Sequence, residues 1–296
     1  MKRVEQPREL SRQTRAWRAA GERSGLVPTM GALHEGHLSL VRAAREACDR
    51  VAVSIFVNPL QFDEPQDLRR YPRPLERDLA LLAEAGVDLA YLPREEHLYP
   101  PGFETRVAPG VTAAELEGAC RPGHFAGVCT VVLKLLAAAG PDAAWFGAKD
   151  AQQLAVVRRM AADFDLPLEI VAGPTVRDPD GLALSSRNER LSPAERERAL
   201  VLSRALFAAR TAARAGAAPP AAALAAARQE LERGGAGVEV EYLEIRNCLD
   251  FRPAGDRLHR AVMVLAARVG GTRLIDNMPL DPAAEALLGG PPERVG

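Results

Sequence analysis

The chain has 296 residues, of which 47% are hydrophobic and 26% charged, and its net charge is −1. This composition is that of a globular protein with one large domain or two ordinary ones, and it provides no overall basic field for a nucleic acid. The four cysteines form no C-x-x-C pair and no apolar run approaches 18 residues, so we expect no zinc ribbon, disulfide framework or membrane span. A reduced, cytoplasmic enzyme or binding protein is the expected class.

Helical and strand patterns alternate through the first 174 residues. The expected helices cover 8–20, 36–50, 74–86, 131–140 and 150–164, and the expected strands cover 24–30, 51–58, 87–93, 143–147 and 168–173. Apolar strands that alternate with amphipathic helices are typical of a parallel α/β sheet. The sequence therefore predicts a Rossmann-like domain over residues 1–174.

The pattern changes after Pro174. Residues 177–188 resemble a polar loop, and Ser192, Pro193 and Glu195 occupy the positions of a capping box at a helix start. An alanine-rich stretch, broken at 217–220, predicts two helices joined by a turn. Strands are expected at 238–246 and 261–269, and a loose tail from Gly289. These elements predict a smaller α+β domain over residues 175–296.

The stretch "PTMGALHEGHLSL" (28–40) joins the first expected strand to a helix through a glycine turn. Such a turn aims backbone N–H groups of the helix start at an anion. His34 and His37 are three residues apart and share a helix face, so both imidazoles can reach one ligand. Zinc binding is disfavoured because no third ligand stands nearby. Phosphate binding and an incidental polar turn both remain open on these residues alone.

The motif "HEGH" resembles the H-x-G-H signature of the nucleotidylyltransferase superfamily, and "PTMGALHEGHLSLVRAAR" resembles its pantoate–β-alanine ligase family. Five further blocks match in order, namely SIFVNPLQF (54–62), DLRRYPRPLERDL (67–79), RPGHFAGVCTVVLKLL (121–136), FGAKDAQQL (146–154) and RDPDGLALSSRN (177–188). The resemblance implies ATP-dependent condensation of D-pantoate with β-alanine through a pantoyl adenylate. It also implies ATP and Mg²⁺ as cofactors, a homodimer, and no nucleic-acid or membrane partner. Residues 1–174 would bind ATP and pantoate, and residues 175–296 would form a lid.

The resemblance assigns roles to residues near the first two strands. His37 would be the catalytic imidazole and His34 would contact the nucleotide phosphates, while Met30 and Gly31 would shape the ATP cleft. Gln61 would contact both pantoate and β-alanine, with Asn58 beside it. On chemistry alone, Met30 is equally a core residue closing a strand, and Asn58 suits an Asx turn before Pro59.

Lys149 is one of only three lysines, whereas the other basic residues are arginine. We interpret it as a phosphate contact that needs a compact ammonium group. Asp150 is suited to cap the following helix and also to hold the ribose, since the two roles are compatible. Gln153 would hold pantoate, although an exposed helix position explains it equally well. Gly147 and Ala148 would line the nucleotide site, and the family usually has an acidic residue where Ala148 stands.

The segment "LSSR" occupies the place of the mobile phosphate-binding loop of the superfamily. Arg187 would bind the β- and γ-phosphates and join His34, His37 and Lys149 in the catalytic group. The other expected ATP contacts in this region are Val176, Leu184, Ser185 and Ser186. Composition alone favours a solvated loop here, and no ligand set for a protein-bound metal is visible. Two other functions stay open, namely another nucleotidylyltransferase activity and a nucleotide-binding regulator without catalysis.

Overall fold

The computed structural model describes residues 1–215, 219–234 and 237–295, which group into two compact units. The first unit contains residues 1–146 and 156–171, and the second contains residues 147–155 together with the chain from residue 172 onward. The predicted boundary between residues 174 and 175 stays a prediction, but residues 147–155 pack with the C-terminal unit. Each unit has its own sheet and its own hydrophobic core.

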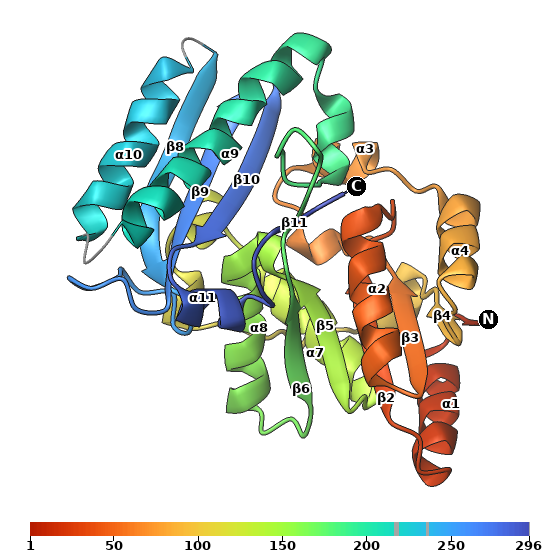
Figure 1. Cartoon of the computed structure of the whole chain (residues 1–296). Helices are drawn as coiled ribbons and strands as arrows, with labels where there is room; N and C mark the ends of the chain where they lie inside the picture. Colours follow the sequence, from red (N-terminus) through yellow and green to blue (C-terminus); the bar gives the residue numbers. More distant parts are fainter. Residues whose placement is uncertain (216–218, 235–236, 296) are drawn as a thin grey trace. The chain divides into compact units, whose positions relative to one another are not determined.

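A six-stranded sheet in the order β1-β4-β3-β2-β5-β6 forms the centre of the first unit (Figure 1). Its strands are β1 (Lys2–Val4), β2 (Ser24–Thr29), β3 (Arg50–Ile55), β4 (Leu89–Tyr91), β5 (Ala143–Gly147) and β6 (Glu169–Gly173). The β1–β4, β4–β3, β3–β2 and β2–β5 pairs are parallel. The predicted Rossmann-like α/β fold is therefore confirmed, and the short edge strand β1 is an addition that the sequence pattern did not indicate.

The five helices expected in this region are present, together with short helices that the alternating pattern did not indicate. They are α1 (Pro7–Ala19), α2 (Glu35–Ala47), α3 (Pro65–Arg70), α4 (Leu75–Glu84), α5 (Glu95–Leu98), α6 (Glu117–Cys120), α7 (His124–Ala139) and α8 (Ala151–Asp163), with 3-10 turns η1 (Pro59–Gln61), η2 (Val111–Ala113) and η3 (Ala148–Asp150). Helix α7 begins seven residues before its predicted start, since buried Val128 and Cys129 extend its apolar face. No helix in the described residues is long and apolar enough to cross a membrane.

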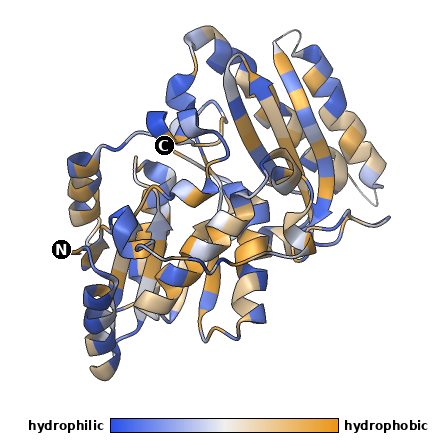
Figure 2. Cartoon of the chain, turned by 180° about the vertical axis from the view of Figure 1, so that it is seen from behind, coloured by the Kyte–Doolittle hydropathy of each residue, from blue (hydrophilic) through white to orange (hydrophobic). Residues whose placement is uncertain are grey.

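The core of the first unit forms because the strand residues are apolar on both faces. Val27, Val51 and Val53 pack with Leu40 and Val41 of α2 and with Leu79 and Leu82 of α4. Helices α1 and α7 contact each other and β2. Because successive side chains of a strand point to opposite faces of the sheet, these two helices cover the face opposite α2 and α4. Strands buried on both faces are the reason for the continuous apolar runs in the sequence. Figure 2 shows the strands of this sheet as largely hydrophobic, whereas hydrophilic residues gather on helices and loops.

The second unit contains an antiparallel sheet in the order β10-β9-β8, packed with helices α9 and α10 (Figure 1). Its elements are β7 (Val176–Arg177), η4 (Ser186–Arg190), α9 (Pro193–Arg214), α10 (Pro220–Arg233), β8 (Val238–Asn247), β9 (Ala261–Val269), β10 (Thr272–Pro279), α11 (Pro282–Leu287) and β11 (Glu293–Arg294). The capping box at the start of α9 is confirmed, because the Ser192 N–H donates to Glu195 and the Glu195 N–H donates to Ser192 Oγ. Residues 217 and 218 of the predicted turn lie outside the described residues.

Two expectations for the second unit are wrong in detail, and one strand was not expected. The polar stretch that begins at residue 177 is not simply a solvated loop, since Arg177 lies in β7 with no exposed surface. Strand β10 was not predicted, because Asp276 and Asn277 interrupt its apolar pattern although both are buried. The tail is not loose at residues 293 and 294, which pair in parallel with β7 as β11.

Candidate active site

The turn before α2 has an unusual backbone. Gly31 and Ala32 both have a left-handed backbone conformation, with φ of 79° and 50°. This conformation is unfavourable for a residue with a Cβ atom, such as Ala32. The Asp78 carboxylate on α4 accepts the Ala32 and Leu33 N–H groups, each at 2.8 Å. Asp78 is only 1% exposed. This buried carboxylate holds the turn that carries the two histidines, and sequence reasoning missed it.

His34 and His37 lie together at the start of α2, as predicted from their spacing. Their ring centroids are 4.1 Å apart, and both side chains are half-buried. The His34 backbone N–H donates to His37 Nδ1 at 3.3 Å. An imidazole nitrogen that accepts this bond carries no proton, so the His37 ring proton lies on Nε2. His37 is thereby set up to donate from Nε2 to an anion.

Gln61 follows β3 on the η1 turn, at the carboxyl end of the strand. Its Oε1 accepts from Asn58 Nδ2 at 2.9 Å, and its Nε2 lies 3.2 Å from Met30 Sδ. The structure thus brings Met30, Asn58 and Gln61 together in the first unit. Because Gln61 is only 9% exposed, its amide has a fixed orientation and not the freedom of a surface residue.

Asn58 uses its side chain inside the protein. Besides Gln61, its Nδ2 donates to the Gly127 carbonyl at 3.1 Å, and its Oδ1 accepts from Tyr99 Oη at 2.7 Å and from the Leu60 N–H at 3.3 Å. The bond to Leu60 is the Asx turn that the sequence left open. With four bonds and 1% exposure, Asn58 orients Gln61. Its direct contact with a substrate stays a prediction.

His124, which has no role assigned from sequence, supports the same turn. Its Nδ1 donates to the Gln61 carbonyl at 2.8 Å, and Arg121 donates to that carbonyl at 3.2 Å. Gly127 lets α7 approach η1, since a Cβ there would lie 2.2 Å from the Leu60 carbonyl oxygen. His124 and Gly127 of the "GHFAG" block are therefore explained by the packing of α7 against the Gln61 turn.

The remaining predicted residues lie in the second unit. Lys149 is half-buried in η3, between Ala148, which is 2% exposed, and Asp150. Asp150 is the last residue of this 3-10 turn, which runs directly into α8. Asp150 therefore directly precedes the first residue of the helix, as the N-cap prediction requires, and whether its side chain caps the helix stays a prediction. Gly147 precedes the turn, and Gln153 is half-buried on α8.

Val176 and the LSSR segment are also brought together in this unit. The Leu184 N–H donates to the Val176 carbonyl at 3.0 Å, and the Arg187 N–H donates to Ser185 Oγ at 3.3 Å. Residues 184–187 are half-buried, so a fully solvated loop does not describe them. Ser186 and Arg187 begin the η4 turn. Within the described residues, no group of three or more His, Cys, Asp or Glu side chains is placed to hold a metal ion.

A Rossmann-like sheet with a glycine turn and two histidines at the end of β2 defines an α/β protein of the nucleotide-binding class. The chain belongs to the pantoate–β-alanine ligase family, because its residues 2–279 match that family. A pantothenate synthetase of Acidiphilium cryptum is 56% identical over 86% of this chain and 91% of the relative. Pantothenate synthetase 1 of Bradyrhizobium diazoefficiens is 51% identical over 95% of this chain and 98% of the relative.

Solved structures agree with this assignment. The pantothenate synthetase of Thermus thermophilus is 49% identical and covers 95% of this chain and 100% of its own, with a TM-score of 0.88. The pantoate–β-alanine ligase of Francisella tularensis, solved with beta-gamma ATP and β-alanine, is 34% identical with a TM-score of 0.78. That comparison covers 95% of this chain and 98% of the other. The family resemblance inferred from the motifs is confirmed.

Replacing Asp78 with alanine is expected to loosen the histidine turn. The change removes the acceptor of one buried and one partly buried N–H group, and a hydrogen bond to a charged group contributes about 1.5–3 kcal/mol. We expect Asp78→Ala to lower the free energy of unfolding by roughly 2–4 kcal/mol, and Asp78→Asn to lower it less. Urea unfolding measures both values. Glu76→Ala, an exposed site on the same helix, is the control, and equal stability of Asp78→Ala and Glu76→Ala contradicts the role of Asp78.

Proposed function

We propose that this protein is an AMP-forming ligase that condenses D-pantoate with β-alanine to pantothenate at the expense of ATP. The match of residues 2–279 to the pantoate–β-alanine ligase family carries the proposal. The relatives named pantothenate synthetase, and the related ligase solved with beta-gamma ATP and β-alanine, support the choice of substrates.

The reaction consists of two displacements. The pantoate carboxylate attacks the α-phosphate of ATP, which forms pantoyl adenylate and releases pyrophosphate. The β-alanine amine then attacks the activated carbonyl carbon, loses a proton, and displaces AMP. Neither step needs a covalent enzyme nucleophile. Burial raises the pKa of the Cys129 thiol to about 12, which makes that cysteine a poor nucleophile. The protein has to align the substrates and offset phosphate charge.

The residues of the first unit are suited to the α-phosphate and to the acceptor substrates. His37, with its proton on Nε2, would donate to a phosphate oxygen as negative charge builds up. His34 would contact the neighbouring phosphate, because its ring lies beside that of His37. The Gln61 amide, fixed by Asn58, would orient the pantoate and β-alanine polar groups. Met30 and Gly31 would border the nucleotide.

The residues of the second unit would complete the nucleotide contacts. Lys149 would supply a compact positive charge to the phosphates, and Arg187 would bind the β- and γ-phosphates as a fork. Val176, Leu184, Ser185 and Ser186 would contact the adenosine and phosphate groups with Gly147 and Ala148. Asp150 would hold the ribose and Gln153 would hold pantoate.

Mg²⁺ would accompany ATP in this reaction. The described residues contain no cluster of three metal-binding side chains, which fits a cation held mainly by phosphate oxygens and water, as Mg²⁺ commonly is. The exposed Asp150 carboxylate beside Lys149 is the protein group suited to join it. When bound, Mg²⁺ would offset the charge of the triphosphate.

An omission assay tests the proposed function. AMP, pyrophosphate and pantothenate are measured with ATP, D-pantoate and β-alanine together, and then with each left out in turn. We expect equal amounts of the three products only in the complete mixture. Without β-alanine, the first step can release at most one pyrophosphate per enzyme molecule. Repeated turnover without pantoate or without β-alanine, or turnover with a phosphorylated acceptor instead, indicates another nucleotidylyltransferase. Calorimetric binding of ATP without turnover, even at high protein concentration, indicates a regulator and contradicts the proposal.

The cellular setting and assembly follow from the same proposal. Because the reaction consumes ATP, we infer that the protein works in the cytoplasm, with small-molecule substrates as its ligands and with neither nucleic acid nor membrane as a partner. We also expect a homodimer, as the family resemblance implies. Light scattering coupled to size exclusion tests this, and a monomeric mass of 31.8 kDa contradicts it.

A further inference from the structure

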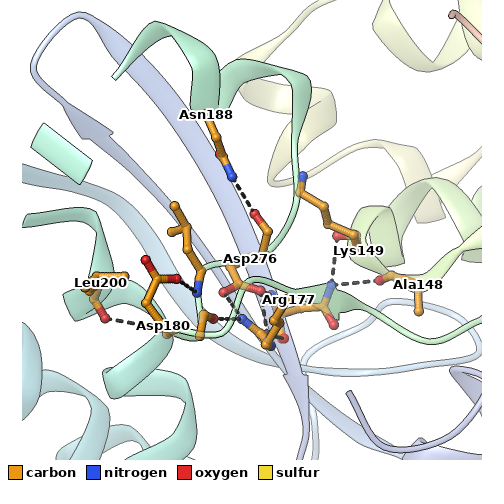
Figure 3. Close-up of polar contacts among 12 residues, drawn as sticks. Ala148, Lys149, Arg177, Asp180, Asn188, Leu200 and Asp276 are labelled. Atoms are coloured by element: carbon orange, nitrogen blue, oxygen red, sulfur yellow. Dashed lines mark hydrogen bonds and ion pairs between the residues drawn. The ribbon is translucent and has the colours of Figure 1, made fainter. Parts of the chain in front are cut away.

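A buried polar network in the second unit ends at the backbone of Lys149 (Figure 3). Its centre is the ion pair between Arg177 of β7 and Asp276 of β10, with nitrogen–oxygen distances of 2.7 and 2.8 Å. The two side chains are 0% and 4% exposed. A buried, bidentate pair of this kind has one defined geometry, so it fixes β7 against β10.

Arg177 also binds two backbone carbonyls. Its Nη1 donates to Gly181 at 3.1 Å and its Nη2 donates to Asn277 at 3.0 Å. Gly181 lies in the turn that leads from β7 toward the LSSR segment, and that turn is closed by the bond from the Asp178 N–H to the Leu182 carbonyl at 2.8 Å. One guanidinium therefore ties the base of this segment to the strand that carries Asn277.

Asn277 extends the network to the Lys149 turn. Its Nδ2 donates to the Ala148 carbonyl and to the Lys149 carbonyl, each at 2.8 Å. Asn277 is 2% exposed. The two bonds identify Nδ2 as the amide nitrogen, because the opposite assignment would place an oxygen against two carbonyl oxygens. In Figure 3 the Lys149 side chain extends away from this anchored backbone.

We propose that Asn277 is a positioning residue for Lys149. It fixes the backbone from which the ammonium group reaches ATP, and the Arg177–Asp276 pair fixes Asn277 in turn. The inference rests on the proposed function, in which Lys149 contacts the phosphates. Loss of Asn277 leaves the Lys149 side chain in the protein, but the backbone that carries this side chain is no longer held by the two hydrogen bonds. A displacement of about 1 Å in a catalytic group can lower a rate about a hundredfold.

A double-mutant cycle with Lys149 tests the proposal. Asn277→Leu removes both donors and retains a side chain of similar size, and Asn277→Ala is the second variant in case one of them folds poorly. Pantoate-dependent exchange of pyrophosphate into ATP reports the first chemical step. We expect either Asn277 variant to lower kcat/KM for ATP by about ten- to a hundredfold. In a Lys149→Ala background the same change is expected to lower it less than twofold, because a group that acts through Lys149 has nothing left to position.

The control is Asn247→Ala, which removes a side-chain bond to the Leu249 N–H at the end of β8 in the same sheet. We expect wild-type exchange from it. If the Asn277 change lowers kcat/KM for ATP by the same factor with Lys149 present and with Lys149→Ala, its role is a general structural one and the proposal is overturned. An Asn277 variant with wild-type kcat/KM also overturns it. Failure of the proposed function is distinct, since the wild-type protein then shows no pantoate-dependent exchange.

Discussion

His37→Ala is expected to lower kcat by about 10²- to 10⁴-fold while the protein remains folded. The imidazole is held by the His34 N–H at Nδ1, so its Nε2 proton can point to a ligand. Alanine removes that donor at the phosphate where negative charge builds up. The half-buried position of His37 means that truncation leaves no large cavity. The omission assay gives kcat, and circular dichroism with urea unfolding checks the fold.

The matched control for this prediction is His259→Ala. The His259 side chain is 67% exposed in the second unit and belongs to no proposed contact, so we expect its turnover to equal that of the wild type. His37→Gln adds a further distinction, since an amide can donate a hydrogen bond but cannot serve as a proton source at neutral pH. Partial activity in His37→Gln favours electrostatic stabilisation of the phosphate. A His37→Ala protein with near wild-type turnover removes His37 from the mechanism.

The parts of the fold that the sequence predicts well are those with strong local periodicity. Strands β2 and β3 are apolar on both faces because helices cover both sides of the sheet, and the capping box at Ser192 is a local pattern. Strand β10 was missed for the opposite reason. Asp276 and Asn277 look like loop residues until the buried Arg177 guanidinium, 99 residues away from Asp276 along the chain, is placed beside them.

The candidate site shows the same division between local and distant information. The spacing of His34 and His37 predicts their contact, because both lie in one helical turn. The partners that hold these elements are distant in sequence. Asp78 is 46 residues from Ala32, and His124 is 63 residues from Gln61. A single sequence carries no periodic signal for such pairs. The one local sign for Asp78 was a carboxylate next to Leu79 on the apolar side of α4.

Substitution of Lys149 is the second change from which we expect a large loss of activity. Arginine supplies 35 of the 38 basic residues in this chain, so a lysine here departs from the bias of the composition. We expect Lys149→Ala to lower kcat/KM for ATP by about 10²- to 10³-fold, as loss of a preorganised charge contact does. Lys149→Arg retains the charge but is also expected to lose at least tenfold, because the planar guanidinium is larger and binds in a different geometry. Pyrophosphate exchange at varied ATP concentration measures both variants.

Lys134→Arg is the control that separates this expectation from a general intolerance of arginine. The Lys134 ammonium lies 5.0 Å from the centre of the Phe103 ring, a contact that a guanidinium makes equally well, so wild-type exchange is expected. If Lys149→Arg also retains wild-type kcat/KM, only the charge matters at position 149 and the argument from lysine usage is wrong. If Lys149→Ala retains wild-type kcat/KM, Lys149 does not contact ATP. The buried network of Arg177, Asp276 and Asn277 then contributes only to the stability of the second unit.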